Sequence, residues 1–360
     1  MRIFLSFLTI LLLAACSQMP AKLTLVEKKY SALRGWNQDN QGQSLIAFKK
    51  SCARLKFLGK NYNMGWPAGY AGNWFKVCDK ANTTSPKNAR KFFEQNFTPY
   101  LVGDNGNPQG VFTGYYEPEL NGSRVSYGKY IHPVYKTPKN FKKPYLSRKK
   151  IIDGGLEGKN LEIAYVDDAV ALFFLHIQGS GRIKLDDGSV IKVGYHNQNG
   201  YAYTSIGRLL VETGVFELEE VTAQKVKNYL YANEERAYAL MNENESYIFF
   251  RKLKATKNPI GAQSVELTPG YSLAVDKRFI QYSTPIWLET TIPLDEDKTH
   301  AQNFHRLMIA QDTGGAIKGI VRGDVFLGFG KKAGHTAGLM RQDGLYYMLL
   351  PNNIRPLVGE

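Results

Sequence analysis

The chain reads AQDTGGAIKGIVRGDVF from Ala310 to Phe326, and this stretch places two aspartates around a glycine-rich turn between two apolar runs. Residues 307–310 predict a buried strand, and residues 325–327 predict a second one after a turn that tolerates positive φ. Asp312 would end the first strand and Asp324 would begin the second, both close to an apolar core. A carboxyl group there loses solvation, so its pKa rises and it can hold a proton for a leaving group. The competing interpretation is that both aspartates only cap turns.

The N-terminus carries a pattern typical of exported lipoproteins. The apolar stretch from Ile3 to Ala15 is shorter than the ~20 residues that span a bilayer, and it fits the hydrophobic region of a signal peptide. Small residues directly precede Cys16, as in the lipobox, where a peptidase cleaves before a cysteine that carries the lipid. We expect residues 1–15 to be removed and Cys16 to be lipidated. Because neither Ser17 nor Gln18 is an aspartate, we expect an outer-membrane anchor facing the periplasm. The alternative is an ordinary secretory signal with a chance cysteine.

Composition indicates a globular protein with an anionic partner. The chain has 360 residues, of which 43% are hydrophobic, enough for one large core or two smaller ones. Its net charge is +14, but the lysines are scattered, with no basic helix, zinc spacing or base-stacking motif that would indicate nucleic acid. An anionic polysaccharide or a membrane surface fits better. Cys52 and Cys78 would favour a disulfide in an oxidising compartment, and two buried thiols are the alternative.

Hydrophobic periodicity predicts a mixed α+β chain. One helix has its apolar face at Leu45, Phe48, Cys52 and Leu55. Further helices are predicted at 88–97, 203–212 and 222–243. Strands are predicted at 111–118, 130–135, 182–185, 189–195, 272–276, 284–288 and 346–350, with a hairpin turn at 186–188. This order favours a β-rich insertion between two parts of a larger domain.

Two groups of residues have the chemistry of a carbohydrate site. The segment QGSGR at 178–182 follows the apolar run 172–177, and its glycines would let a sugar approach the backbone, although a strand-to-hairpin turn explains them equally well. The second group combines amides and aromatic rings suited to sugar hydroxyls and sugar faces, although half of its tyrosines are equally explained as core residues. Its members are Tyr195, Asn197, Asn199, Tyr201 and Tyr203.

No cofactor is expected. The histidines lack metal-ligand spacing, so we assign no metal. Lys318 follows glycines but lacks the residue order of a phosphate-binding loop, which argues against a nucleotide.

Several segments together resemble the membrane-bound lytic murein transglycosylase A family. Besides 310–326, the segments TGYYEP at 113–118, IQGSG at 177–181, GYHNQNG at 194–200 with SIGR at 205–208, and NESYIFF at 244–250 follow in family order. The resemblance implies a double-psi β-barrel domain with a second, inserted β-barrel domain and a substrate groove between them. We place the first domain at 16–112 and 241–360 and the insertion at 113–240.

The resemblance also implies an activity and roles for residues. The family cleaves the β-1,4 bond between N-acetylmuramic acid and N-acetylglucosamine without water, leaving a 1,6-anhydromuramyl end. Asp324 matches its catalytic acid/base, Asp312 matches a supporting carboxylate, and Asp276 is a third candidate without an assigned role. Substrate contacts are expected from Tyr116, Gln178, Gly179, Ser180, Tyr195, Asn197 and Lys318. Peptidoglycan strands would be the main partner, with cell-wall synthesis or hydrolysis enzymes as further candidates.

Two other functions compete with this hypothesis. The triplet Asp312-Thr313-Gly314 also occurs in aspartic proteases, but the chain has no second such triplet and is long for a homodimer subunit with one motif. The other rival is a non-catalytic peptidoglycan-binding lipoprotein, in which replacement of Asp324 would change no product.

Overall fold

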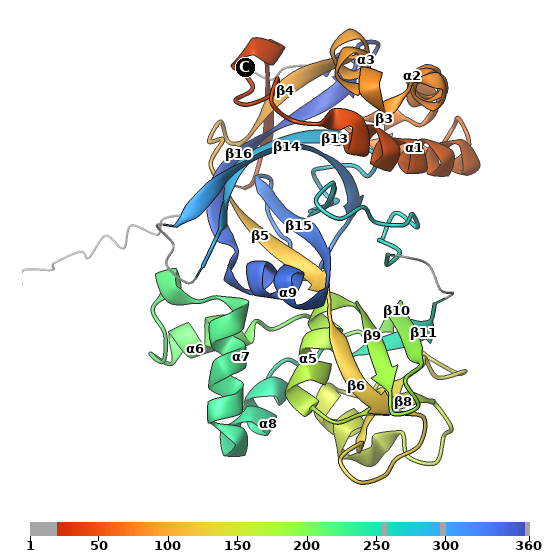
Figure 1. The fold of residues 1–360 in the computed structure, drawn as a ribbon, viewed down its shortest axis with the longest axis vertical. Helices are drawn as coiled ribbons and strands as arrows, with labels where there is room; N and C mark the ends of the chain where they lie inside the picture. Colours follow the sequence, from red (N-terminus) through yellow and green to blue (C-terminus); the bar gives the residue numbers. More distant parts are fainter. Residues whose placement is uncertain (1–19, 254–257, 296–299, 357–360) are drawn as a thin grey trace, which may run out of the picture.

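The computed structural model describes residues 20–253, 258–295 and 300–356, and it is a mixed α/β structure with extensive sheets, as the sequence predicts (Figure 1). The signal peptide and Cys16 lie outside the described residues. Within these residues, no helix is both long and apolar enough to cross a membrane.

The first sheet contains a closed ring of strands. Its order is β1 (Leu23–Glu27), β4 (Phe97–Asp104), β16 (Arg341–Pro351), β13 (Pro285–Pro293), β14 (Ala301–Asp312), β12 (Ser272–Val275), β15 (Arg322–Phe329) and β5 (Gly110–Glu117). The ring closes because β16 also pairs with β5, through Arg341 opposite Thr113. Residues 286–288 and 307–310 are buried on both faces of their strands, which explains why these runs are continuously apolar rather than alternating.

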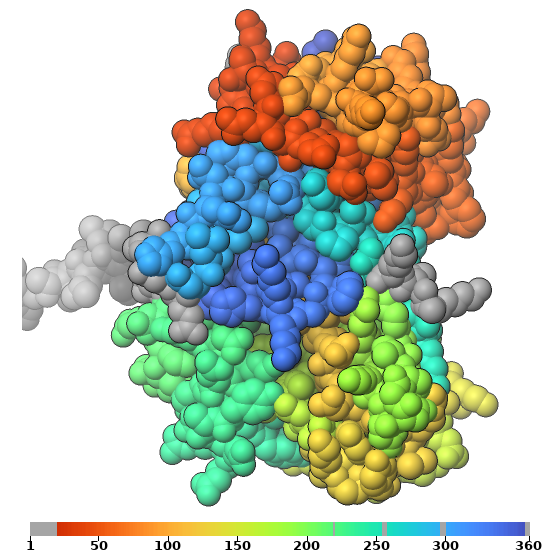
Figure 2. Space-filling model, viewed as in Figure 1, coloured from red at the N-terminus to blue at the C-terminus, as the bar shows by residue number. Residues whose placement is uncertain are grey.

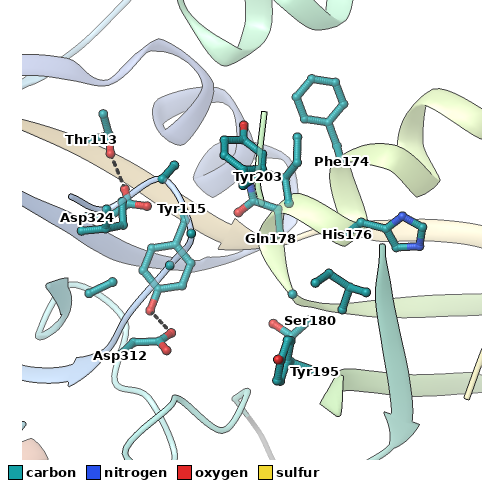
Figure 3. Close-up of a pocket in the computed structure, with 18 of the residues that line it drawn as sticks. Thr113, Tyr115, Phe174, His176, Gln178, Ser180, Tyr195, Tyr203, Asp312 and Asp324 are labelled. Atoms are coloured by element: carbon teal, nitrogen blue, oxygen red, sulfur yellow. Dashed lines mark hydrogen bonds between the residues drawn. The ribbon is translucent and has the colours of Figure 1, made fainter. Parts of the chain in front are cut away.

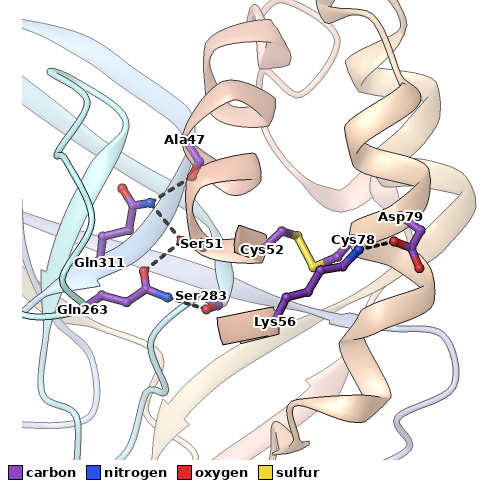
Figure 4. The surroundings of a disulfide bond; sticks show 9 residues. All are labelled: Ala47, Ser51, Cys52, Lys56, Cys78, Asp79, Gln263, Ser283 and Gln311. Carbon is purple, nitrogen blue, oxygen red and sulfur yellow. Dashed lines mark hydrogen bonds and ion pairs between the residues drawn. A yellow bond between two sulfur atoms is a disulfide. The ribbon is translucent and has the colours of Figure 1, made fainter. Parts of the chain in front are cut away.

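Helices from the N-terminal part cover one side of this ring. They are α1 (Gln41–Leu58), α2 (Gly72–Thr83) and α3 (Ala89–Asn96), with the small hairpin β2 (Asn63–Gly65) and β3 (Gly69–Tyr70) and the short turns η1 (Tyr30–Ala32) and η2 (Pro86–Asn88). The side chain of Asn40 caps α1 by accepting a hydrogen bond from the Gly42 N–H at 3.1 Å. A disulfide joins Cys52 of α1 to Cys78 of α2 (Figure 4). We call these three helices the N-terminal cap.

The second sheet lies at the other end of the molecule (Figure 1). Its order is β11 (Ile248–Lys252), β10 (Val190–Gln198), β9 (Ser180–Leu185), β6 (Glu119–Ser123), β8 (Glu162–Val166) and β7 (His132–Tyr135). A single parallel bridge from Lys136 to Phe250 brings its two edges together. Its helical elements are α4 (Arg148–Lys150), η3 (Ile151–Gly155), α5 (Ala169–Gln178), α6 (Ile206–Glu212), η4 (Leu218–Glu220), α7 (Ala223–Ala232) and α8 (Glu234–Asn242). The chain enters this sheet directly from β5, so the two sheets are continuous at residue 118.

Three helical segments differ from the sequence-based expectation. The region 222–243 forms two helices, because Asn233 leaves the helical conformation at φ −129° and ψ 55°. The apolar run 172–177 is part of helix α5, so the strand-to-hairpin interpretation is wrong. Asp168 caps its start and Gly179 ends it. Helix α9 (Gly330–Leu339) was not predicted. The predicted limits of the insertion, 113 and 240, lie inside β5 and α8, and the division into domains stays a prediction.

Candidate active site

A cavity of about 850 Å³ lies where the two sheets meet, and residues of both line it (Figure 3). Figure 2 shows the outside of this junction, with the blue residues of the first sheet above the green and yellow residues of the second. From the first sheet the lining includes Thr113, Tyr115, Asp312 and Asp324, and from the second it includes Gln178, Gly179, Ser180 and Tyr195.

Both predicted aspartates belong to one row across four neighbouring strands. Asp324 of β15 is paired with Thr113 of β5 on one side and with Ala274 of β12 on the other. Ala274 is in turn paired with Asp312, the last residue of β14. Residues directly opposite each other share a face of the sheet, so both carboxyls lie on the face of the Ala274 methyl group, and both line the cavity. Two strand spacings of about 4.8 Å separate the aspartate backbones by roughly 10 Å.

A β-bulge gives Asp312 its direction. The pairing moves from Leu273 opposite Ala310 to Ala274 opposite Asp312, so Gln311 is the extra residue. Without the extra residue, the strict alternation of a strand would turn Asp312 away from the face that Asp324 shares. The side chain of Gln311 is fully buried on the opposite side, toward α1.

Three donors hold the carboxylate of Asp312. The Tyr115 hydroxyl donates to its Oδ2 at 2.7 Å, and the N–H groups of Ala262 and Thr313 donate to its Oδ1, each at 2.9 Å. Burial raises the pKa of Asp312 above its usual value, and these three hydrogen bonds oppose that rise. Thr313 lies within the predicted turn, so the turn-capping interpretation describes part of what Asp312 does.

Asp324 has fewer hydrogen-bond donors. The Thr113 hydroxyl donates to its Oδ1 at 2.6 Å, and Arg322 donates from Nη2 to the same hydroxyl at 2.8 Å. Burial raises the pKa of Asp324, the positive charge of Arg322 and the Thr113 hydrogen bond lower it, and the nearby charge of Asp312 raises it further. The carboxylate form of Asp312 thus has more hydrogen-bond donors in this structure than that of Asp324.

The opposite wall comes from the junction of α5 and β9. Gly179 adopts φ 75°, a conformation that favours glycine, and its N–H caps the helix at Leu175. This turn presents Gln178 and Ser180 to the cavity. The Gln178 side chain is fixed because its Oε1 accepts a hydrogen bond from the Tyr116 N–H at 3.1 Å. Tyr195 of β10 is half exposed at the cavity rim.

Other predicted residues lie elsewhere. Among the described residues that line the cavity we do not find Tyr116, Asn197, Lys318 or Asp276. The Tyr116 ring packs beside Gly334 of α9, and Lys318 is exposed on the loop between β14 and β15. Asp276 pairs with Arg278 at 2.6 Å and accepts the Gly319 N–H at 2.9 Å, so it holds the loop that follows the aspartate turn.

Sequence reasoning missed Thr113 and Tyr115. Both lie on the face of β5 that meets Asp324, whereas Tyr116 points to the other face. Side chains alternate between the two faces of a strand, so counting in twos from Thr113 would have placed Tyr115, and not Tyr116, on the face toward Asp324. Tyr203, predicted within the amide and aromatic cluster, does line the cavity, whereas Asn199 is fully buried and ties Leu146, Glu245 and Tyr247 together.

Within the described ranges, no three His, Cys, Asp or Glu side chains come together as a metal site. His176 is buried against Arg148, whose Nη1 lies 2.9 Å from its Nδ1. Burial and this neighbouring charge hold the pKa of His176 well below its usual value, so the ring is neutral.

The chain matches known families over most of its length. Residues 111–251 match the family model of the MltA specific insert domain, and residues 271–350 match that of the 3D domain. The chain is 34% identical to the membrane-bound lytic murein transglycosylase A of Vibrio cholerae over 250 residues, which are 68% of this chain and 67% of that protein. It is also 34% identical to a homolog of that enzyme from Buchnera aphidicola over 242 residues, spanning 65% of that relative's length.

Solved structures agree with these matches. A membrane-bound lytic murein transglycosylase from Agrobacterium tumefaciens superposes with a TM-score of 0.80 at 31% identity, covering 92% of this chain and 98% of that one. Escherichia coli MltA with bound chitohexaose superposes with a TM-score of 0.70 at 26% identity, covering 91% and 94%. On this evidence, the chain belongs to the membrane-bound lytic murein transglycosylase A family.

Proposed function

We propose that this protein is a lytic transglycosylase that cleaves the β-1,4 bond between N-acetylmuramic acid and N-acetylglucosamine in peptidoglycan and forms a 1,6-anhydromuramyl end. The observation that carries the proposal is the row of Asp324 and Asp312, two carboxyls with unequal hydrogen bonding at one wall of the cavity. The relatives that the chain matches are named as lytic murein transglycosylases, and one of them binds chitohexaose, a β-1,4-linked sugar chain. We also propose the double-psi barrel class for the first sheet and the junction cavity as the glycan groove.

In the proposed mechanism Asp324 is the only acid and base. Its carboxyl proton moves to the glycosidic oxygen as the bond from that oxygen to C1 of the muramyl residue breaks. The resulting carboxylate then takes the proton of the muramyl C6 hydroxyl while the C6 oxygen bonds to C1. Asp324 ends protonated, as it began, so the cycle needs no proton from solvent.

Asp312 supports this reaction through the negative charge of its carboxylate. Its carboxylate is held by the Tyr115 hydroxyl and two backbone N–H groups before substrate binds, so it can stabilise the positive charge that develops at C1 without reorganising. The uncharged side chains of Gln178, Ser180 and Tyr195 fit sugar hydroxyls and a sugar face.

The proposed location is the periplasmic side of the outer membrane, with a lipid on Cys16. The relatives are named as membrane-bound, and Cys16 follows a lipobox pattern. The net charge of +14 suits peptidoglycan, whose stem peptides carry carboxylates, and other cell-wall enzymes are further proposed partners.

The test is mass spectrometry of the products that the mature chain releases from peptidoglycan sacculi. We compare wild type, Asp324→Asn and Asp343→Asn, because Asp343 is an exposed aspartate of β16 and serves as the matched control. Anhydromuropeptides should come from wild type and from the control. Asp324→Asn should lower turnover by about 10²- to 10⁴-fold while sacculus binding is retained. Reducing-end products would indicate a hydrolase, and binding without released sugar would indicate a non-catalytic peptidoglycan-binding lipoprotein.

A further inference from the structure

Helix α1 lies outside the segments that match the family models, yet its buried polar groups reach the strand that carries Asp312. The side-chain amide of Gln311 donates to the Ala47 carbonyl at 2.9 Å and to the Ser51 hydroxyl at 2.8 Å (Figure 4). Gln311 is the bulge residue directly before Asp312. The orientation of Asp312 therefore depends on a contact with the N-terminal cap.

The same serine also reaches the loop that supplies a donor to Asp312. Ser51 donates to Oε1 of Gln263 at 2.8 Å, and the Gln263 N–H donates to the Gln311 carbonyl at 3.1 Å. The residue before it, Ala262, donates its N–H to Oδ1 of Asp312. Ser51 thus connects the two chain segments that meet at this carboxylate.

The remaining amide atoms of Gln311 and Gln263 also have hydrogen-bond partners. Oε1 of Gln311 accepts from the Ser272 hydroxyl at 2.6 Å, and the Gln263 amide donates to the Ser283 hydroxyl. Ser51, Ser272, Ser283 and Gln311 are fully buried, and Gln263 is 5% exposed. Inside a protein, a hydrogen bond is stronger than in water, and a chain of satisfied bonds holds a single geometry.

We propose that Ser51, Gln263 and Gln311 are positioning residues that hold Asp312 and the Ala262 N–H in hydrogen-bonding alignment. None of the three touches the reacting atoms, and the proposal rests on the proposed function of Asp312. Loss of the network would let the 261–263 loop move relative to the bulge. The carboxylate of Asp312 would then lose part of the donation that keeps it ionised.

Loss of the network should shift the pKa of Asp312 in a predictable direction. The titratable groups that face Asp312 are Tyr115 from β5, Tyr282 from the segment before β13, and Asp324 from β15. All three groups remain present in the Ser51 variant. Weaker donation to the carboxylate raises the pKa of Asp312, so the protein needs a higher pH to ionise it. The acid limb of the activity profile, which reports that ionisation, moves to higher pH.

The experiment compares Ser51→Ala with Ser44→Ala in the mature chain. Ser44 is also fully buried on α1 and donates to β14, at the Leu307 carbonyl, but it lies outside the network around Asp312. Both variants lose a buried hydroxyl of α1 that contacts β14, with two hydrogen bonds lost at Ser51 and one at Ser44. A purely structural role therefore predicts a loss of stability in each variant, with no specific shift of the acid limb in Ser51→Ala.

We expect Ser51→Ala alone to lower kcat by about 10- to 100-fold with unchanged KM and to move the acid limb upward. A ¹³C-carboxyl titration, with the Asp312 signal assigned through Asp312→Asn, should show the same upward shift. Gln263→Ala is the second variant, and it should act in the same direction. Equal shifts in the two serine variants, or no shift in either, would overturn the proposal. If wild type forms no anhydromuropeptides but the carboxyl signal shifts only in Ser51→Ala, the positioning role stands and the proposed function fails.

Discussion

The two walls of the cavity are built in different ways. The wall from the first sheet consists of paired strands in register, and each of its carboxyls has a hydrogen-bond donor. On the wall from the second sheet, a helix end and neighbouring strands present the uncharged side chains of Gln178, Ser180 and Tyr195, and Tyr195 is 49% exposed. The contrast shows where rigidity is needed. Under the proposed function, the proton donor must be desolvated and held in place, whereas the glycan strand is bound through many weak contacts that tolerate adjustment.

Apart from replacement of Asp324 itself, the largest expected effect comes from removing the charge of Asp312 on the wall from the first sheet. Asp312→Asn keeps the shape, since its Oδ1 can still accept from Ala262 and Thr313 and its amide can donate to the Tyr115 hydroxyl. We expect kcat to fall by roughly 10²- to 10³-fold with little change in KM. The charge of Asp312 raises the pKa of Asp324, so its loss lowers that pKa. Because Asp324 must be protonated, the alkaline limb of the profile should move to lower pH.

Steady-state kinetics on soluble glycan strands across pH would check this prediction. An unchanged kcat would mean that Asp312 only caps a turn. It would also contradict the distinction between a wall that carries charge for the reaction and a wall that binds the glycan.

An intermediate effect is expected from the disulfide, which tests whether the strand wall depends on the N-terminal cap. The double variant Cys52→Ala/Cys78→Ala opens a loop with a sequence separation of 26 residues. We expect the free energy of unfolding to fall by about 3 kcal/mol. Denaturant titration of the double variant, compared with wild type under reducing and oxidising conditions, would measure it. A wild-type protein whose stability is indifferent to reductant would contradict the expectation.

The smallest expected effect lies on the binding wall. Tyr195→Ala removes an aromatic face from the cavity rim, and a stacking contact of about 1 kcal/mol corresponds to a loss in affinity of roughly fivefold. The change should appear in KM or in chitohexaose binding, with kcat preserved. Tyr70→Ala is the control, since that tyrosine is 54% exposed and is absent from the described cavity lining. A large loss of kcat in Tyr195→Ala would mean that this wall takes part in the chemistry as well.

The spacing of apolar residues within short segments was enough to predict much of the secondary structure. The helix with its face at Leu45, Phe48, Cys52 and Leu55 is α1, and the predicted helix 88–97 is α3. Both follow from apolar periodicity, which needs no knowledge of distant residues. The run 172–177 was ambiguous because a short apolar stretch fits a buried strand and a buried helix equally well. Asp168 and Gly179, at its two ends, were the cap signals that favoured the helix.

The sequence alone was enough to predict the candidate residues, namely the aspartates at 312 and 324, the glycine-rich turn between them, and the lipobox at Cys16. Each of these signals lies within a short segment, so it can be recognised without knowledge of the fold. Only the tertiary structure decided that Thr113, Tyr115 and Ser51 belong with the aspartates, since sequence separations of 211, 197 and 260 residues join Thr113 to Asp324, Tyr115 to Asp312 and Ser51 to Gln311. Strand register and burial across such separations depend on how the whole core packs, and no short segment encodes that packing.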